Sequence, residues 1–247
     1  MRHRPGLTAC LLLGLLGGAG AAQGAEGDIP EADVVLHEAT RAIGANWGGS
    51  IQRLATQAIV SSPEGASRVL VDSAYSDRLS FEQRYFDGRY FAGWINGEAA
   101  WYRSGNNPAL FELDDGQRRA LRANQWHVMC LGLEERFSDF EAAGREAFAG
   151  QRAIKLSMRD ASGQDAAAYF DPDTFMPLGL RLAPQIPDEP HVSIHFEDWR
   201  DVEGIRLFHQ ARVVQGPRVY RYVYTDIDLD PPGDDPFEVP AAIAQAP

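Results

Sequence analysis

The residues that could do chemistry are spaced in ways that argue against a metal centre. His191 and His195 have the spacing of a ligand pair, but they fall in a stretch that reads as a β-strand. At ~3.3 Å per residue, the two side chains would lie about 13 Å apart there, too far to bind one ion. No accompanying cysteine or His-Glu-x-x-His pattern supports a metal site. We therefore predict that both histidines face solvent and that the protein holds no metal.

A second group of possible ligands is acidic. Asp226, Asp228 and Asp230 imitate the start of a calcium-binding loop. The sixth position of such a loop requires glycine and the twelfth requires glutamate. Pro231 and Phe237 stand at these two positions. The segment is better explained as the acidic end of a strand, with a weak surface calcium site as the alternative.

Paired carboxylates, which glycoside hydrolysis uses, occur at Glu134-Glu135 and Asp234-Asp235. Both pairs fall in apparent loops, and a chain with 35 acidic residues contains such pairs by chance. No nucleophile elbow, phosphate-binding loop or dinucleotide fingerprint follows the N-terminal segment. We predict that the protein has no catalytic residues, is not an enzyme and needs no cofactor.

The N-terminal segment has the layout of a secretory signal peptide. Arg2 and Arg4 precede an apolar run over 7–20, and 22–24 (Ala-Gln-Gly) fit a cleavage site. The run is too short to span a membrane. We expect cleavage near residue 24, a single domain over 25–247 and a periplasmic location. No later stretch reads as a transmembrane segment.

The two cysteines are separated by this cleavage. Cys10 resembles the acylated cysteine of a lipoprotein, but its apolar run follows the cysteine instead of preceding it, so ordinary cleavage is favoured. Cys130 is then the only cysteine left, which excludes an intramolecular disulfide. Its apolar surroundings favour a buried inert thiol over a nucleophile.

The charge balance restricts the class of partner. The formal net charge is −12, and Lys155 is the only lysine. A strongly acidic surface argues against binding nucleic acid and against electrostatic docking on anionic lipid.

The elements that must position these residues are mostly strands. Helical spacing predicts a helix over 29–45, and Asp114 with Gln117 predicts a capping box that starts a second helix. Asp87-Gly88 and Asn96-Gly97 indicate tight hairpins within a meander over 50–103. The stretch 134–143 reads as a short helix or a loop. Further strands are expected at 145–149, 151–159, 165–170, 175–182, 191–200, 204–215 and 217–229.

Alternation sorts the residues of the later strands into an apolar and a polar face. The apolar sets are Leu178, Leu180 and Leu182; Val192, Ile194 and Phe196; Ile205 and Leu207; and Val219, Val223 and Ile227. The opposite faces carry Arg181, Ser193, His195, Glu197, Arg206, Gln210 and Arg212. This pattern indicates a sheet curved over something apolar. Either the helices fill that concave face, or they fill it partly and leave a pocket for an acyl chain.

Four segments resemble proteins of the outer-membrane lipoprotein-sorting superfamily. Residues 169–178 (YFDPDTFMPL) resemble a hairpin of that superfamily, and 196–205 (FEDWRDVEGI) resemble one of its strand turns. Thr225-Asp226-Ile227 and 237–240 (FEVP) resemble its closing strand and C-terminus. The similarity covers nearly the whole chain after the signal, and the order of the motifs is more specific than any one of them.

The resemblance implies an α+β fold like that of LolA, LolB and the N-terminal domain of RseB/MucB. This fold is an unclosed, strongly curved antiparallel half-barrel of about 11 strands, with helices over its concave face. It also implies a non-catalytic binding protein whose partner is a lipid or an acylated protein. The candidate ligand-binding residues are Leu178, Leu180, Leu182, Ile194, Phe196, Ile205 and Leu207. The alternative is a module that senses envelope stress through an envelope protein partner, and an enzyme of unknown type ranks third.

Overall fold

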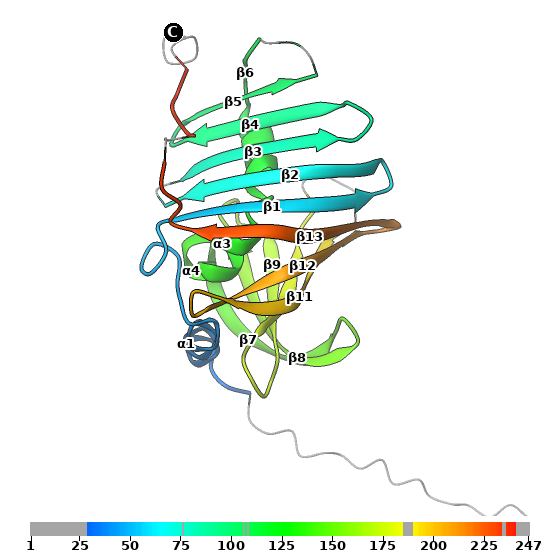
Figure 1. Ribbon diagram of the computed structural model, residues 1–247. Helices are drawn as coiled ribbons and strands as arrows, with labels where there is room; N and C mark the ends of the chain where they lie inside the picture. The colour runs from blue at the N-terminus through cyan, green and yellow to red at the C-terminus, as the bar shows by residue number, and fades with distance from the viewer. Residues whose placement is uncertain are drawn as a thin grey trace, which may run out of the picture.

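The computed structural model describes residues 29–240, apart from 76, 106, 108, 185–189 and 234–235. The predicted signal peptide, Cys10 and the Asp234-Asp235 pair therefore lie outside the described residues. Within them, thirteen strands form one antiparallel sheet that does not close on itself (Figure 1). The fold is mostly β with a few helices, as the sequence predicts.

The sheet runs in the order β6-β5-β4-β3-β2-β1-β13-β12-β11-β10-β9-β8-β7. Its last strand in sequence, β13, is central and pairs with both β1 and β12. The strands are β1 (Arg53–Ser62), β2 (Gly65–Ala74), β3 (Arg78–Tyr85), β4 (Tyr90–Asn96), β5 (Ala99–Ser104), β6 (Phe111–Glu112), β7 (Phe137–Phe148), β8 (Gln151–Asp160), β9 (Asp165–Phe170), β10 (Pro177–Leu182), β11 (Val192–Val202), β12 (Ile205–Gln215) and β13 (Arg218–Leu229).

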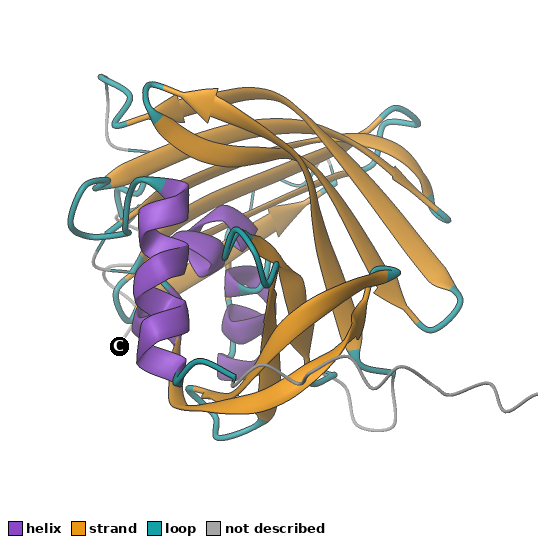
Figure 2. Cartoon of the chain, turned by 90° about the horizontal axis from the view of Figure 1, so that it is seen from below, coloured by secondary structure: helices purple, strands orange, loops and turns teal. Residues whose placement is uncertain are grey.

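The helices lie on the concave side of the curved sheet (Figure 2). They are α1 (Ala32–Ile43), α2 (Asp115–Arg122), α3 (Trp126–Leu131) and α4 (Leu133–Arg136). α1 ends at Gly44, whose φ of 91° lets its N–H reach the Thr40 carbonyl oxygen at 2.9 Å. Every residue of α3 is buried, so this short helix fills the space between the sheet and the other helices.

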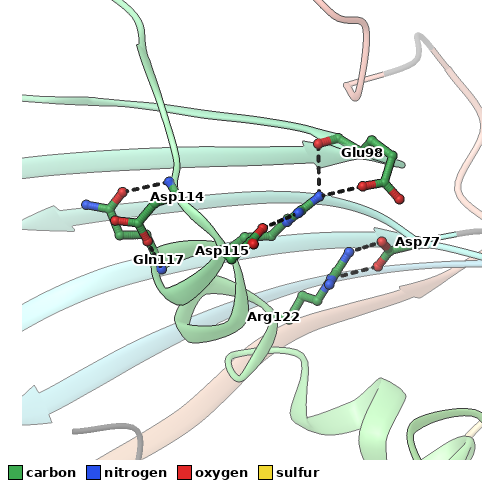
Figure 3. Close-up of polar contacts among 7 residues, drawn as sticks. Asp77, Glu98, Asp114, Asp115, Gln117 and Arg122 are labelled. Atoms are coloured by element: carbon green, nitrogen blue, oxygen red, sulfur yellow. Dashed lines mark hydrogen bonds and ion pairs between the residues drawn. The ribbon is translucent and has the colours of Figure 1, made fainter. Parts of the chain in front are cut away.

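α2 begins with the predicted capping box. The Gln117 N–H donates to Asp114 Oδ1 at 2.8 Å, and the Asp114 N–H donates to Gln117 Oε1 at 3.0 Å (Figure 3). Two arginines of the same helix reach the turns between strands. Arg118 donates to the Glu98 carbonyl oxygen at 2.9 Å, and Arg122 pairs with Asp77. These contacts fix α2 against the end of the β2–β5 meander.

The first part of β7 lies where the sequence reads as a short helix or a loop, and its end matches the strand expected at 145–149. Its pairing with β8 shifts register between Ser138 and Glu141 and again between Ala142 and Gly144. Asp139 and Gly144 have φ values of 55° and 112°. Bulges of this kind remove the alternation by which a strand is predicted. The sheet has 13 strands, compared with the about 11 that the resemblance implied.

Bulges also correct the expected faces of two strands. In β10 the pairing shifts between Pro177 and Gly179. Leu180 consequently faces the main core, whereas Leu178 belongs to a separate small cluster with Phe148, Ala153, Ala167 and Tyr169. The expected common face of Leu178, Leu180 and Leu182 is therefore wrong for Leu178.

In β13 the corresponding shift falls at Thr225, which is left without a partner in the pairing with β1. Tyr220, Tyr222 and Tyr224 pack on the main core from this strand. Val219 and Val223, which were expected there, are 37% and 47% exposed. Only Ile227, which follows the bulge, lies in the core as expected.

Candidate functional site

The seven candidate ligand-binding residues do not form one open surface. Leu180, Ile194, Phe196 and Leu207 are buried in the main core, and none is more than 5% exposed. Leu182 and Ile205 are partly buried against that core, and Leu178 lies in the separate small cluster. Their proposed role in ligand binding stays a prediction.

α3 covers this part of the sheet. The His127 ring stacks on Phe208 with ring centroids 3.8 Å apart, and its Nε2 lies 2.9 Å from the Phe208 carbonyl oxygen. Trp126 packs edge-on against Tyr222 at 4.3 Å. Complete burial lowers the pKa of His127 to about 3, so the ring is neutral at pH 7. α3 therefore fills part of the concave face of the sheet with core side chains. This is the first of the two arrangements that the sequence left open for that face.

A groove with both apolar and polar residues in its lining remains beside α3. It has a volume of about 330 Å³ and lies between α1 on one side and the α3–α4 segment on the other. In Figure 2, α1 is the longest helix and lies at the open side of the sheet next to the shorter ones. The groove is lined by Asp33, Leu36, His37, Ala39, Thr40, Ile43, Asn46, Trp47, Cys130, Leu131, Gly132, Leu133, Glu134, Glu135 and Phe170.

The floor of the groove follows from the sequence of α1. Leu36, Ala39 and Ile43 recur at helical spacing and are buried on the inner face of the helix. After Gly44 the chain turns back, and the Trp47 N–H donates to the Leu131 carbonyl oxygen at 3.1 Å. This bond joins the segment after α1 to the end of α3, so that both walls of the groove are held together at one end.

The remaining floor comes from α3, α4 and the sheet. Leu131, Leu133 and Phe170 are all buried beneath the groove. Cys130 lines it as well, and burial raises the pKa of its thiol, which keeps the sulfur protonated. Cys130 is therefore buried in apolar surroundings, as predicted.

The rim of the groove is polar and acidic. Asp33 and His37 are exposed on α1, and Glu134 and Glu135 are exposed on α4. No lysine or arginine is among the residues that line it. An apolar floor beneath a charged rim suits a molecule that has an apolar tail and a polar head.

The outer, convex face has a cavity of similar size. This convex cleft has a volume of about 340 Å³ and lies over β8, β9 and β10. Glu146 organises the side chains beside it, because its carboxylate accepts from Tyr169 Oη at 2.8 Å and pairs with Lys155 and Arg181 at 3.3 Å. Arg181 also lies over the Tyr169 ring at 5.2 Å.

His191, which precedes β11, and His195, which lies within β11, have different environments. His191 is exposed, as expected, and lines the convex cleft. His195 is only 8% exposed and stacks on Phe148 with ring centroids 4.7 Å apart, so the expectation that it faces solvent is wrong. Burial, aided by the positive charge of Arg212, lowers the pKa of His195 to about 4. The stacking partner comes from the end of β7, within the strand expected at 145–149.

Within the described part of the chain, no group of three histidine, cysteine or acidic side chains could hold a metal ion. The helices of that part are also too short, or too polar, to cross a membrane.

The sequence matches no protein-family model and no curated protein. The structure does match solved structures. A LolA superfamily protein of Nitrosomonas europaea is 12% identical with a TM-score of 0.58, over 85% of this chain and 98% of that one. The chain has a LolA-like fold. This confirms the resemblance inferred from the hairpin motifs, at the level of the fold.

Two further solved structures are similar to this chain. A DUF1329 family protein of Desulfovibrio piger is 13% identical with a TM-score of 0.59, over 86% of this chain and 98% of that one. A domain described as an outer membrane lipoprotein-sorting protein of Vibrio parahaemolyticus is 14% identical with a TM-score of 0.53, over 83% and 95%. At these identities the similarity establishes the architecture and leaves function to be argued from the site.

The sequence did not predict the groove, because all seven candidate residues were chosen on the expected strands. None of the seven candidate residues is among those that line the groove. The available signal was the apolar face of α1, whose Leu36, Ala39 and Ile43 must pack against something. The residues on the opposite wall follow the second helix, in a segment with no regular pattern.

Proposed function

We propose that the protein is a non-catalytic binding protein that holds the acyl chain of a lipid or a lipoprotein in the groove between α1 and the α3–α4 segment. The observation that carries this proposal is a groove on the concave side of a LolA-like sheet, beneath which the apolar side chains of Leu36, Ile43, Leu131, Leu133 and Phe170 are packed. The similar domain of Vibrio parahaemolyticus is described as a lipoprotein-sorting protein, which supports the choice of ligand class.

The size and chemistry of the groove suit this ligand. Small-molecule sites in proteins typically occupy ~300–1,000 Å³ and are lined mainly by apolar side chains. The groove, at about 330 Å³, lies at the lower end of that range. Each methylene transferred from water to such a floor contributes about 0.8 kcal/mol. Binding by tail burial requires no catalytic group, in keeping with the absence of a recognisable catalytic motif in the sequence.

The setting belongs to the same proposal. The basic and apolar segments before residue 24 support export, so the binding protein would act in the periplasm as one domain over 25–247. Its partner would be the donor or acceptor of the acylated ligand.

Native mass spectrometry of the full chain, expressed with its N-terminal segment and purified from the periplasm, tests the proposal. We expect a lipid or an acylated peptide to co-purify in near-stoichiometric amount, and lipid extraction then identifies its class. A protein that carries no ligand and takes up no fluorescent fatty acid would contradict the proposal. A protein-interaction module of envelope sensing would then be the better explanation.

A further inference from the structure

We propose that the amphiphile held in this groove carries a cationic head group. This inference rests on the proposed function and adds the class of ligand. The groove supplies the tail site, and the carboxylates on its rim, defined as Asp33, Glu134 and Glu135, supply the head-group site.

The rim carboxylates come from both walls of the groove. Asp33 lies in the first turn of α1, while Glu134 and Glu135 lie on α4 across the opening. All three side chains belong to exposed residues. A head group at the mouth of the groove therefore meets negative charge from two sides while the tail lies below.

No cation of the described residues neutralises this rim by an ion pair. The salt bridges there include neither Asp33 nor Glu134 nor Glu135. Arg41, the nearest arginine on α1, pairs with Glu38 at 3.0 Å. Arg136, next to Glu135 in sequence, donates to Gln125 Oε1 at 2.8 Å instead. Its electrostatic attraction to Glu135 leaves Asp33 and Glu134 as the stronger sites for a ligand.

The acidic rim is not simply the average surface of an acidic protein. The convex cleft has nearly the same volume, yet Lys155, Arg181 and His191 line it, with Asp165 as its only carboxylate. Lys155 and Arg181, which pair with Glu146, offset the carboxylates beside the cleft, whereas no lysine or arginine lines the groove. Charge complementarity favours a cationic head group at the groove and disfavours the carboxylate or phosphate of an anionic amphiphile.

Three probes that share one acyl chain test this inference. Lauroylcholine has a cationic head group, monolauroylglycerol a neutral one and laurate an anionic one. Each is used below its critical micelle concentration to displace a fluorescent fatty acid from the full chain at pH 7.5. Because an exposed ion pair contributes modestly, we expect lauroylcholine to bind about tenfold more tightly than laurate at low salt. The ratio should shrink in high salt, which screens exposed charges.

Substitutions of the rim carboxylates test whether they cause the preference for the cationic probe. Asp33→Asn combined with Glu134→Gln should bring the affinities for lauroylcholine and laurate together. The matched control is Asp165→Asn, which removes one carboxylate from the convex cleft and should leave the ratio as it is. Asp165 pairs with Arg159 at 3.3 Å, so its loss also changes the charge balance of that face.

The outcomes separate this inference from the proposed function. Equal affinities for the three probes, or tighter binding of laurate, would overturn the cationic head group and leave acyl binding intact. A preference for lauroylcholine that survives the double variant would also overturn it, because the charge would then act from elsewhere. No displacement by any probe would remove both proposals.

Discussion

The groove and the convex cleft have nearly equal volumes, about 330 and 340 Å³, but they are built differently. Two helical segments form the walls of the groove, and their apolar faces meet over Phe170 of the sheet. The cleft lies on the outer face of the strands alone, where Glu146 holds Lys155, Arg181 and Tyr169. Volume alone therefore does not mark a binding site. Side chains from two helical segments line the groove, whereas the charged side chains beside the cleft are already paired with one another.

The largest expected effect concerns Gly179, whose bulge separates the two regions. A Cβ at this position would lie 1.9 Å from the Ile194 carbonyl oxygen, and φ is 154°. We expect Gly179→Ala to lower the free energy of unfolding by more than ~3 kcal/mol, measured by urea denaturation. Both regions should be affected, since Leu178 packs on the convex side and Ile194 on the concave side.

Gly163→Ala is the matched control for Gly179. Gly163 also has a positive φ, 78°, but a Cβ there would meet nothing within 4 Å. We expect a loss of only about 1 kcal/mol from backbone strain. Equal losses for the two variants would show that the close approach at Gly179 has no energetic role.

Acid should destabilise the protein through both regions. Unfolded histidines have a pKa of about 6.5. His127 near the groove has a pKa of about 3, and His195 on the convex side has one of about 4. Folding lowers both pKa values, so the stability they contribute is fully present above pH ~6.5. It is lost as the pH falls toward 4 for His195 and toward 3 for His127.

The slope of the free energy of unfolding against pH gives the number of protons taken up on unfolding, and this number measures the destabilisation by acid. Between pH 4.5 and 6, the two histidines should together bind up to about two more protons in the unfolded than in the folded protein. His195→Phe, which keeps a ring against Phe148, should reduce that number by about one. An unchanged slope of stability against pH in this variant would show that His195 is protonated in the folded protein.

Filling the groove should weaken ligand binding without unfolding the chain. Thr40 is exposed on the groove side of α1, whereas Val34 is 45% exposed and does not line the groove. We expect Thr40→Trp to weaken binding of a fluorescent fatty acid by at least about tenfold, and Val34→Trp to leave it unchanged. Circular dichroism checks that both variants stay folded. Equal affinities would place the acyl chain outside this groove.

The smallest expected effect lies in the convex cleft. Tyr169→Phe removes the hydroxyl that donates to Glu146 at 2.8 Å and keeps the ring stacked on Phe148 at 4.0 Å. We expect a loss of about 1 kcal/mol in the free energy of unfolding and no change in ligand affinity. A loss of fatty-acid binding in this variant would connect the cleft to the site and break the contrast between the two regions.

The sequence predicted those elements that carry a local signal. The capping box of Asp114 and Gln117, the Asn96-Gly97 turn and the apolar face of α1 all appear where expected. Each of these depends on residues within one turn or a few positions of chain. The LolA-like architecture was likewise predictable from hairpin motifs taken in order.

The rest depended on backbone irregularities that leave little trace in residue type. Because Thr225 is unpaired, the tyrosines of β13 face the core where its valines were expected. A similar shift in register before Gly179 places Leu178 on the outer face of the sheet. A one-residue shift inverts every side chain beyond it, because the period of a strand is two. The groove was missed for another reason, since it forms between helices that meet only in the folded chain.

The central position of β13 has a consequence for how the chain folds. The register pairs Leu54 near the start with Leu229 near the end, and β13 alone joins the β1–β6 half of the sheet to the β7–β12 half. The last strand to be synthesised is thus the one that unites the sheet. Such long loop closures are slow to form. A chain that emerges from N-terminus to C-terminus therefore completes this sheet only after β13 has emerged.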